Sequence, residues 1–275
     1  RRQRQMCIRD RDSNVYALNG EDGSLLWSYS TNGWVDASPA LGDVNNDGKL
    51  EVIICSRDDN IYVFNGENGS LLWSYTTGGD AISSPALADI DGDGCLEIIA
   101  TSRDGNVYAF NGEDGSLLWR YTAGVWFWSS PALGDVDNDR KIEIIIGTDS
   151  SEILCLNGED GSLLWRCAVG DDVGSSPALG DIDGDSDLEI LAGSKDYNIY
   201  ILDGRSGGLL WECPTGGRVD SSPALGDLDR DCCLEFVIGS YDQNIYAFKF
   251  PNSGFRVYWQ GLRGDPYFNS TRCLH

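Results

Sequence analysis

The feature that most constrains this sequence is a repeat with a period of 46 residues. The segment SSPALGD or a close variant recurs five times, with its proline at Pro39, Pro85, Pro131, Pro177 and Pro223. The segment LLW recurs at the same interval, and its tryptophans are Trp27, Trp73, Trp119, Trp165 and Trp211. A period of about 40–50 residues with strand-like content is typical of β-propeller blades. Six periods of 46 would fill 276 residues and the chain has 275, so one repetitive domain accounts for its length.

Each repeat indicates four short strands. In residues 83–122 the apolar runs SSPALADI, EIIATS, NVYAF and LLWRY are separated by Gly, Asp or Asn, and each is too short for a helix. In IEIII and NVYAF neighbouring residues are both apolar, which predicts strands buried on both faces between stacked sheets. The turn NGEDGS closes a hairpin between the third and fourth strands. We therefore predict an all-β fold: a six-bladed β-propeller of four-stranded antiparallel blades.

The period also sets the expected blade boundaries. Five blades are predicted at residues 33–78, 79–124, 125–170, 171–216 and 217–262. A sixth would combine N-terminal strands, beginning at residues 5–8, with residues near 264–269, which would close the ring and protect its sheet edges. Residues 1–11, RRQRQMCIRDR, break the repeat and resemble translated sequencing-adapter sequence. We interpret them as a non-native leader, followed by a single propeller domain over residues 12–275.

Composition excludes several classes of partner. The net charge of −24 argues against nucleic acid, because phosphate binding needs a basic surface. A hydrophobic content of 41% with nine Trp and twelve Tyr favours a packed core over disorder. No apolar run approaches the roughly 18 residues of a membrane span. The nine cysteines are odd in number and form no CxxC pair, so no disulfide framework is inferred. We expect a monomeric propeller or part of a larger chain.

Five repeats carry the acidic pattern Asp-x-Asp/Asn-x-Asp-x-x-x-Glu, at residues 43–51, 89–97, 135–143, 181–189 and 227–235. We call these segments acidic loops 1 to 5. Ca²⁺ prefers six to eight oxygen ligands, which such a loop supplies from alternate side chains, one backbone carbonyl and a final carboxylate. The predicted side-chain ligands are Asp43, Asn45, Asp47 and Glu51; Asp89, Asp91, Asp93 and Glu97; Asp135, Asp137, Asp139 and Glu143; Asp181, Asp183, Asp185 and Glu189; and Asp227, Asp229, Asp231 and Glu235. The predicted carbonyl ligands belong to the seventh residues, Lys49, Cys95, Lys141, Asp187 and Cys233.

The expected cofactor is Ca²⁺, with up to five ions. The loops place 19 carboxylates at these positions against a net charge of −24, and without cations they would repel one another. The alternative is a set of polar hairpin turns that hold no ion. The sixth position, where glycine would ease the turn, is occupied by Gly48, Gly94, Arg140, Ser186 and Cys232. A positive φ at a non-glycine residue there would cost about 1 kcal/mol, which predicts weaker sites in loops 3 to 5.

Two resemblances cover nearly the whole chain from Asp12 to Trp259. ALNGEDGSLLW (Ala17–Trp27) resembles the tryptophan-docking repeat of pyrroloquinoline-quinone-type (PQQ-type) propellers. SSPALGDVDNDRKIEIIIG (Ser129–Gly147) is similar to the FG-GAP/VCBS repeats of integrin α-subunit propellers and secreted microbial proteins. These resemblances imply a propeller fold, bound calcium and an extracellular or cell-envelope location.

The loop between LLWxY and SSPAL varies most among the repeats. At its tips we expect ligand-binding side chains, which are Trp34, Asp36, Asp80, Trp126, Trp128, Asp172, Arg218 and Asp220. If they converge on one face, aromatic rings beside carboxylates and an arginine suit a carbohydrate, a peptide or a small polar ligand. The alternative is that Trp126, Phe127 and Trp128 plug the channel or pack between blades.

Three functions are compatible with these features. The leading hypothesis is a calcium-stabilised recognition or adhesion module that is not an enzyme, because the one histidine is His275 and no Ser-His or Cys-His pair can form. A quinone-dependent dehydrogenase is an alternative, suggested by the docking repeat and the adjacent Cys232 and Cys233. Such enzymes are expected to be longer and eight-bladed, and these cysteines fall inside an acidic loop. A scaffold for membrane-protein assembly in the bacterial envelope also shares the docking repeat, but the acidic loops weigh against it.

Overall fold

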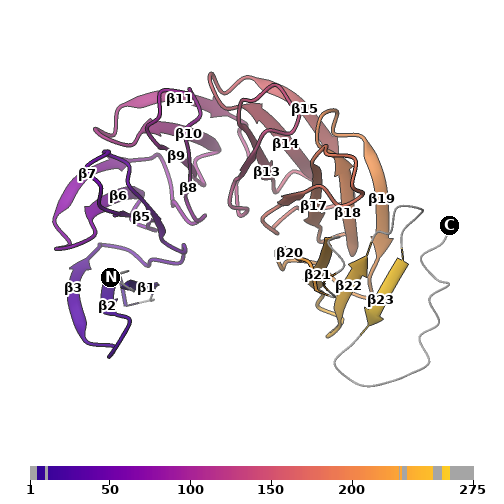
Figure 1. Ribbon diagram of the computed structural model, residues 1–275, viewed down its shortest axis with the longest axis horizontal. Coiled ribbons are helices and arrows are strands. Elements are labelled where there is room, and N and C mark those ends of the chain that lie inside the picture. The colour runs from indigo at the N-terminus through magenta and orange to yellow at the C-terminus, as the bar shows by residue number, and fades with distance from the viewer. Residues whose placement is uncertain (1–4, 10–11, 229, 231–233, 250–255, 261–275) are drawn as a thin grey trace. The chain divides into compact units, whose positions relative to one another are not determined.

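The computed structural model describes residues 5–9, 12–228, 230, 234–249 and 256–260, the first and last of these ranges by their backbone alone. The regular structure of these residues consists of β-strands arranged in six antiparallel sheets, labelled in Figure 1. The chain divides into two compact units. Unit 1 comprises residues 1–131 and 158–162, and unit 2 comprises residues 132–157 and 163–275.

Unit 1 contains a three-stranded sheet and two four-stranded sheets. The first sheet, in the order β1-β2-β3, consists of β1 (Gln5–Arg9), β2 (Asn14–Asn19) and β3 (Leu25–Ser30). The second, in the order β4-β5-β6-β7, consists of β4 (Ala40–Gly42), β5 (Glu51–Cys55), β6 (Asn60–Asn65) and β7 (Leu71–Thr76). The third, in the order β8-β9-β10-β11, consists of β8 (Ala86–Ala88), β9 (Glu97–Thr101), β10 (Asn106–Asn111) and β11 (Leu117–Thr122).

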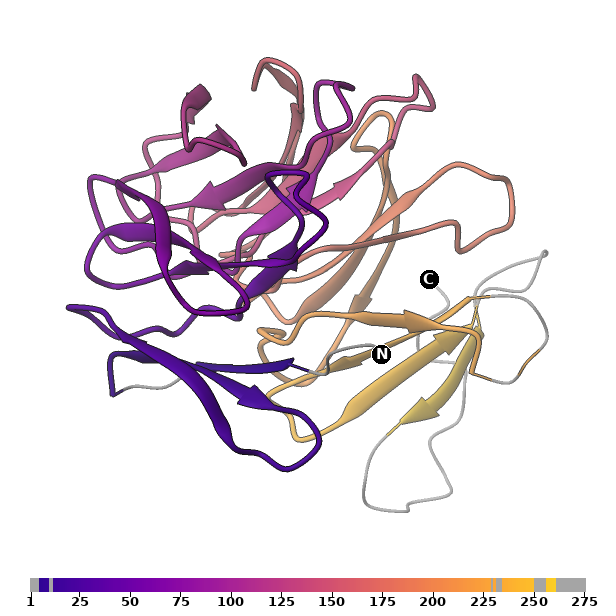
Figure 2. The ribbon, with the colours of Figure 1, turned by 60° about the vertical axis from the view of Figure 1, so that its left-hand side comes forward.

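Unit 2 repeats the four-stranded arrangement three times, and its hairpins can be followed in the turned view of Figure 2. Its first sheet consists of β12 (Ala132–Gly134), β13 (Glu143–Gly147), β14 (Glu152–Asn157) and β15 (Leu163–Ala168). The next consists of β16 (Ala178–Gly180), β17 (Glu189–Gly193), β18 (Asn198–Asp203) and β19 (Leu209–Pro214). The last consists of β20 (Ala224–Gly226), β21 (Glu235–Gly239), β22 (Ile245–Lys249) and β23 (Arg256–Gln260).

The predicted all-β class and the four-stranded antiparallel sheets are confirmed. The sheet β1-β2-β3 has three strands, and β1 pairs with β2 over Gln5–Arg9 although it falls within the residues interpreted as a leader. The segment near residues 264–269, predicted to complete this sheet, lies outside the described residues. Ring closure and the count of six blades therefore stay predictions.

In four of the five four-stranded sheets the second strand is buried along its whole length. All five residues of β5, β9, β13 and β17 are buried, as the runs of consecutive apolar residues predicted. In unit 1 the side chains of Ile53 and Val63 join those of Ile98 and Phe110 in one cluster between neighbouring sheets. Unit 2 has an equivalent cluster that includes Ile145 and Leu202. The core thus consists of apolar side chains packed between successive sheets within each unit.

The repeated tryptophans attach each repeat to the hairpin turn of the next. An indole N–H on the last strand of a sheet donates to a backbone carbonyl 39 residues later, where the following turn begins. These bonds join Trp27 to Gly66 at 2.8 Å, Trp73 to Gly112 at 3.0 Å, Trp119 to Gly158 at 2.7 Å, and Trp165 to Gly204 at 2.9 Å. These four tryptophans are therefore packing residues of the framework.

A glycine in the same turn makes room for each indole. Gly115 has a φ of +72°, and its counterpart Gly69 has a φ of +71°. A Cβ built on Gly115 would lie 2.6 Å from Cδ2 of Trp73. Gly23 occupies the equivalent turn of the sheet β1-β2-β3 with a φ of +71°, but no atom of the described side chains and backbone lies within 4 Å of its Cβ position. The turn conformation and the indole contact are thus separable requirements.

Four aspartates provide a second link between repeats. Asp58 accepts a hydrogen bond from the backbone N–H of Asn32 at 2.8 Å and from the hydroxyl of Tyr62 at 2.8 Å. The equivalent acceptors Asp104, Asp196 and Asp242 bind the N–H groups of Gly78, Gly170 and Gly216. The third repeat has Ser150 at this position, so it lacks the carboxylate. Each link fixes the start of a variable loop against the following sheet.

These contacts predict different effects of two matched glycine substitutions. Gly115→Ala should lower the free energy of unfolding by about 2–4 kcal/mol, because alanine pays for a positive φ and also clashes with Trp73. Gly23→Ala should cost only about 1 kcal/mol, because no described atom lies close to its Cβ position. Chemical denaturation of both variants measures the difference. Equal losses of stability would show that the indole contact does not constrain the turn.

Candidate metal centres

Each acidic loop connects the first two strands of its sheet. In loop 2, Asp89 directly follows β8 and Glu97 is the first residue of β9. The pairing of Ala88 with Glu97 brings the two ends of this loop together. The strand pairing therefore places the first and last predicted ligands side by side.

Within the loop, the aspartates accept hydrogen bonds from its backbone. Asp89 binds the N–H of Gly92 at 2.7 Å through Oδ1 and that of Gly94 at 3.0 Å through Oδ2. Asp93 binds the N–H of Cys95 at 2.7 Å. Loop 1 has the same pattern, with Asp43 binding the N–H of Gly48 at 2.9 Å. These bonds fold nine residues into a tight turn whose carboxylates lie close together.

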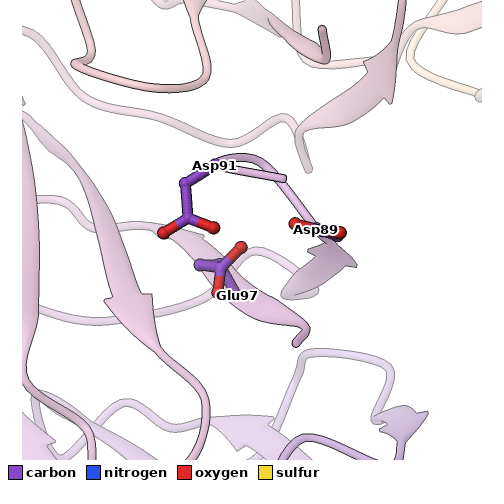
Figure 3. Close-up of side chains that lie close together, drawn as sticks. All are labelled: Asp89, Asp91 and Glu97. Atoms are coloured by element: carbon purple, nitrogen blue, oxygen red, sulfur yellow. The ribbon is translucent and has the colours of Figure 1, made fainter. Parts of the chain in front are cut away.

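Three carboxylates converge in loops 2, 3 and 4. In each of these loops, one ligand oxygen from the first, third and ninth residues lies within 4.8 Å of the others. Figure 3 shows Asp91 and Glu97 pointing toward each other beside Asp89. The other two groups are Asp135, Asp137 and Glu143, and Asp181, Asp183 and Glu189. Ligand oxygens about 2.4 Å from a central Ca²⁺ lie at most about 5 Å apart, so these groups match its size.

The fifth-position aspartates lie outside these three groups. Asp93, Asp139 and Asp185 each direct one oxygen to the N–H of the seventh residue, at 2.7 to 2.9 Å. The seventh residues were predicted as carbonyl ligands, and their N–H groups stabilise the turn. In loop 5 the predicted ligands Asp229, Asp231 and Cys233 lie outside the described residues. Loop 1 has Asn45 at its third position, so its carboxylates are Asp43, Asp47 and Glu51.

The glutamate that ends each loop is buried, and one of its oxygens is held by the backbone. Oε2 of Glu97 accepts the N–H of Ile90 at 2.8 Å, and Glu51 accepts that of Val44 at 3.1 Å. Both glutamates are 0% exposed, and Oε1 of each has no hydrogen-bond partner. A buried carboxylate oxygen without a partner is costly. This oxygen beside clustered aspartates fits a bound cation.

Burial also changes the proton affinity of these glutamates. The pKa of Glu97, Glu143 and Glu189 is raised to about 7, chiefly by desolvation and also by the neighbouring aspartates, against the lowering effect of the backbone hydrogen bond. Burial likewise raises the pKa of Glu51. A divalent cation at the same place would favour the ionised form.

Two loop positions require a left-handed backbone. The sixth residues Arg140 and Ser186 have φ of 72° and 77°, close to the 82° of Gly48. The expected positive φ at these non-glycine residues is therefore confirmed, the weaker calcium binding inferred from it stays a prediction, and Cys232 lies outside the described residues. Sequence analysis missed the fourth position, where φ is also positive. The residues there are Asn46, Gly92, Asn138, Gly184 and Arg230, and the preference for Asn and Gly was the signal.

In unit 1 the predicted ligand-binding residues contact two arginines that sequence analysis missed. The guanidinium of Arg57 forms an ion pair with Asp36 and lies 5.4 Å from the ring centroid of Trp34. Arg103 pairs with Asp80 at 3.1 Å. It also lies 4.1 Å from the Trp128 ring and 5.5 Å from the Trp126 ring. We call these contacts the arginine–tryptophan pairs of unit 1.

In this region Trp126 and Trp128 are exposed by 53% and 41%, and Phe127 is fully buried. Phe127 is therefore packed in the interior, as the packing alternative has it, whereas the two tryptophans are partly exposed. Plugging of the channel by these tryptophans stays a prediction. In unit 2, Asp172 pairs with Lys195 at 2.9 Å and Arg218 lies 5.1 Å from the Tyr241 ring. Asp220 has a buried Oδ1 without a hydrogen-bond partner. Convergence of all eight predicted residues on one face stays a prediction.

The raised pKa values predict how stability depends on pH in calcium-free protein. Glu97, Glu143 and Glu189 hold a proton more tightly when folded, with a pKa of about 7, than at their ordinary value of 4.5. Stability should therefore fall as pH rises from about 5 to 8. Melting temperatures at both ends of this range measure the effect. Glu97→Gln should reduce the dependence and Glu113→Gln, in an exposed turn, should not; identical behaviour of the two variants would contradict the assignment.

The described residues contain no helical segment with the length and hydropathy that a bilayer crossing requires. Among solved structures, the chain is similar to BamB from Moraxella catarrhalis, with a TM-score of 0.72 and 15% identity over 94% of this chain and 73% of that one. It is similar to the computationally designed protein Ika8, with a TM-score of 0.72 and 15% identity over 95% and 73%. It is also similar to Sqt1 of Saccharomyces cerevisiae, with a TM-score of 0.74 and 16% identity over 93% and 69%. At these identities the similarities show the fold alone, which is a β-propeller.

Sequence comparison adds the family. No curated protein sequence matches the chain significantly. A family model of the PQQ_2 type, described as outer membrane protein assembly factor BamB, matches residues 3–125 and 136–247. This match confirms the resemblance to PQQ-type repeats, and the similarity to FG-GAP/VCBS repeats stays a prediction. Because the model matches more than half of the sequence, the chain belongs to the PQQ-type β-propeller family described as outer membrane protein assembly factor BamB.

Proposed function

We propose that this chain is a non-enzymatic scaffold that binds a protein partner during protein assembly at the cell envelope. The observation that carries the proposal is the family match over residues 3–125 and 136–247. The similarity of the fold to that of Moraxella catarrhalis BamB supports it. The role is one of binding, because the repeated contacts build a rigid framework and leave variation to the loops.

The comparisons favour this scaffold over the adhesion module that the sequence analysis placed first. The acidic loops were interpreted as evidence against a scaffold. The matched ranges contain loops 1, 2, 4 and 5 whole, so acidic loops and the family's repeat occupy the same segments of this chain. The loops therefore add to the family framework. The complete propeller in this proposal has six blades and is closed by pairing of its terminal strands.

The arginine–tryptophan pairs of unit 1 are suited to contact a partner protein. Trp34, Trp126 and Trp128 expose 46%, 53% and 41% of their surface. Tryptophan and arginine are the residues most enriched among those that dominate the binding energy of protein interfaces. Arg103 is fixed by its ion pair with Asp80, so little side-chain entropy remains to be lost on binding.

Calcium is the proposed cofactor of the acidic loops. The carboxylates of the first, third and ninth residues would hold the ion, as in Asp89, Asp91 and Glu97 of loop 2. The buried free oxygens of Glu51 and Glu97 support this assignment. When bound, the ion supplies positive charge that offsets the clustered carboxylates. Its role in this proposal is structural, because it fixes the junction between the first two strands of each sheet.

The scaffold role predicts complementation. In a bacterium that lacks its own assembly factor of this family, the chain exported to the periplasm should restore the folded fraction of outer-membrane porins, measured by their heat-modifiable migration on gels. Replacing Trp126 and Trp128 by alanine should reduce the restored fraction several-fold, because a truncated hot-spot residue typically costs at least 2 kcal/mol of binding.

A matched control separates loss of binding from loss of fold. Leu118 on β11 has the same exposed fraction as Trp128, 41%, and lies outside the variable loops. Leu118→Ala should therefore leave complementation unchanged. Failure of the folded wild-type chain to restore any porin assembly would contradict the scaffold role.

The calcium role predicts a rise in melting temperature when millimolar Ca²⁺ is added to calcium-free protein. Each site filled at ten times its Kd contributes about 1.4 kcal/mol, and 1 kcal/mol shifts the melting temperature of a domain this size by about 2–4 °C. Asp91→Asn should reduce the rise, because it removes a charge but keeps a shape that loop 1 already uses at Asn45. Glu113→Gln is the control, and an unchanged melting temperature of the wild type would refute the calcium role.

A further inference from the structure

The fifth repeat differs from the others at the residue paired with the loop glutamate. On the third strand of each four-stranded sheet, one residue lies directly opposite this glutamate in the antiparallel register. The five pairs are Glu51 with Asn65, Glu97 with Asn111, Glu143 with Asn157, Glu189 with Asp203, and Glu235 with Lys249. A cation therefore stands in the fifth repeat where the others have an amide or a carboxylate.

In three of the other repeats the side chain opposite the glutamate accepts a hydrogen bond from the backbone of the following hairpin turn. Oδ1 of Asn65 accepts the backbone N–H of Glu67 at 3.1 Å. Oδ1 of Asn111 accepts that of Glu113 at 2.9 Å. The equivalent Oδ1 of Asp203 accepts the N–H of Ser206 at 2.7 Å. A lysine carries no acceptor, so Lys249 cannot make this bond.

Lys249 instead contacts the loop glutamate. Its Nζ lies 3.2 Å from Oε1 of Glu235, and the two side chains are only 8% and 6% exposed. Oε2 of Glu235 accepts the N–H of Leu228 at 2.7 Å, as its counterparts do in the other loops. The contact through Oε1 is an ion pair without hydrogen-bond geometry. Both oxygens of Glu235 thus face a positive group or a donor.

The oxygen of Glu235 that faces Lys249 is Oε1, and the equivalent Oε1 of Glu51 and Glu97 has no hydrogen-bond partner. In Glu51 and Glu97 this buried oxygen is the one available to a metal ion. In the fifth repeat an ammonium group takes that place. A calcium ion bound to the same oxygen would lie within about 6 Å of this ammonium, in a buried environment where like charges repel strongly.

We propose that Lys249 is a built-in cation that replaces calcium in acidic loop 5, so that the chain binds calcium in loops 1 to 4 only. The inference rests on the proposed calcium role of the other loops, and it revises the expected number of ions from five to four. Glu235 thereby keeps a positive neighbour whatever the calcium concentration. The other four loops depend on calcium supply.

Equilibrium dialysis of the full chain at saturating free Ca²⁺ tests this count. The wild type should bind four ions, and Lys249→Asn, which restores the residue of the first three repeats, should bind five. The reciprocal change Asn111→Lys should lower the count to three. The control Asn111→Leu loses the turn hydrogen bond but adds no charge, so it should keep four.

The outcomes separate this inference from the calcium role itself. Five ions in the wild type, or four in folded Lys249→Asn, would overturn the role of Lys249 and leave the calcium role intact. Should Lys249→Asn fail to fold, the test passes to loop 2, where a count of four in Asn111→Lys would overturn the inference. A wild type that binds no calcium would overturn both, and it would also show no calcium-dependent rise in melting temperature.

Discussion

The rest of the structure depends on the contact between a tryptophan on one sheet and the hairpin turn of the next repeat. The indole N–H finds a backbone carbonyl at 2.7 to 3.0 Å, and a glycine with positive φ leaves room for the ring. Each repeat alone exposes too much apolar surface to be stable, so it requires a neighbour at a fixed distance and angle. Because the indole contact sets both, the 46-residue period is in effect the spacing at which this contact recurs.

A structure built in this way separates positions that maintain the framework from positions that are free to vary. Asp58 and its counterparts Asp104, Asp196 and Asp242 hold the start of four variable loops through a backbone N–H, so the residues beyond that point can vary without loss of this link to the sheet. The exposed Trp126 and Trp128 lie in the variable loop that lacks this link, because Ser150 takes the aspartate's position, and buried Phe127 between them anchors this loop. A binding surface can therefore change its side chains while the sheets that carry it stay the same.

Much of the framework could be predicted from the sequence, because repetition makes each repeat a test of the others. The strand pattern, the burial of strands such as β5 on both faces and the role of Trp73 all follow from residues that recur at one spacing. The features that were missed depend on contacts between different positions of the repeat. Arg103 was missed as a partner of Trp128 because no local pattern joins residues 25 positions apart. The predicted closure of the propeller rests on residues near 264–269, whose sequence does not match the repeat.

The acidic loops show how one local requirement can be met in two ways. Every loop ends in a glutamate with one oxygen bonded to the backbone N–H of the loop's second residue, which fixes the carboxylate in a buried position. A buried carboxylate is stable only if it is protonated or if positive charge lies close to it. Burial raises the pKa of Glu97, Glu143 and Glu189 to about 7, so near neutral pH these groups are poised between a proton and a cation. Glu235 has its cation supplied by the chain itself, through Lys249 at 3.2 Å. The same backbone geometry thus serves a loop that responds to its ionic surroundings and a loop that does not, and one side chain on the neighbouring strand decides between them.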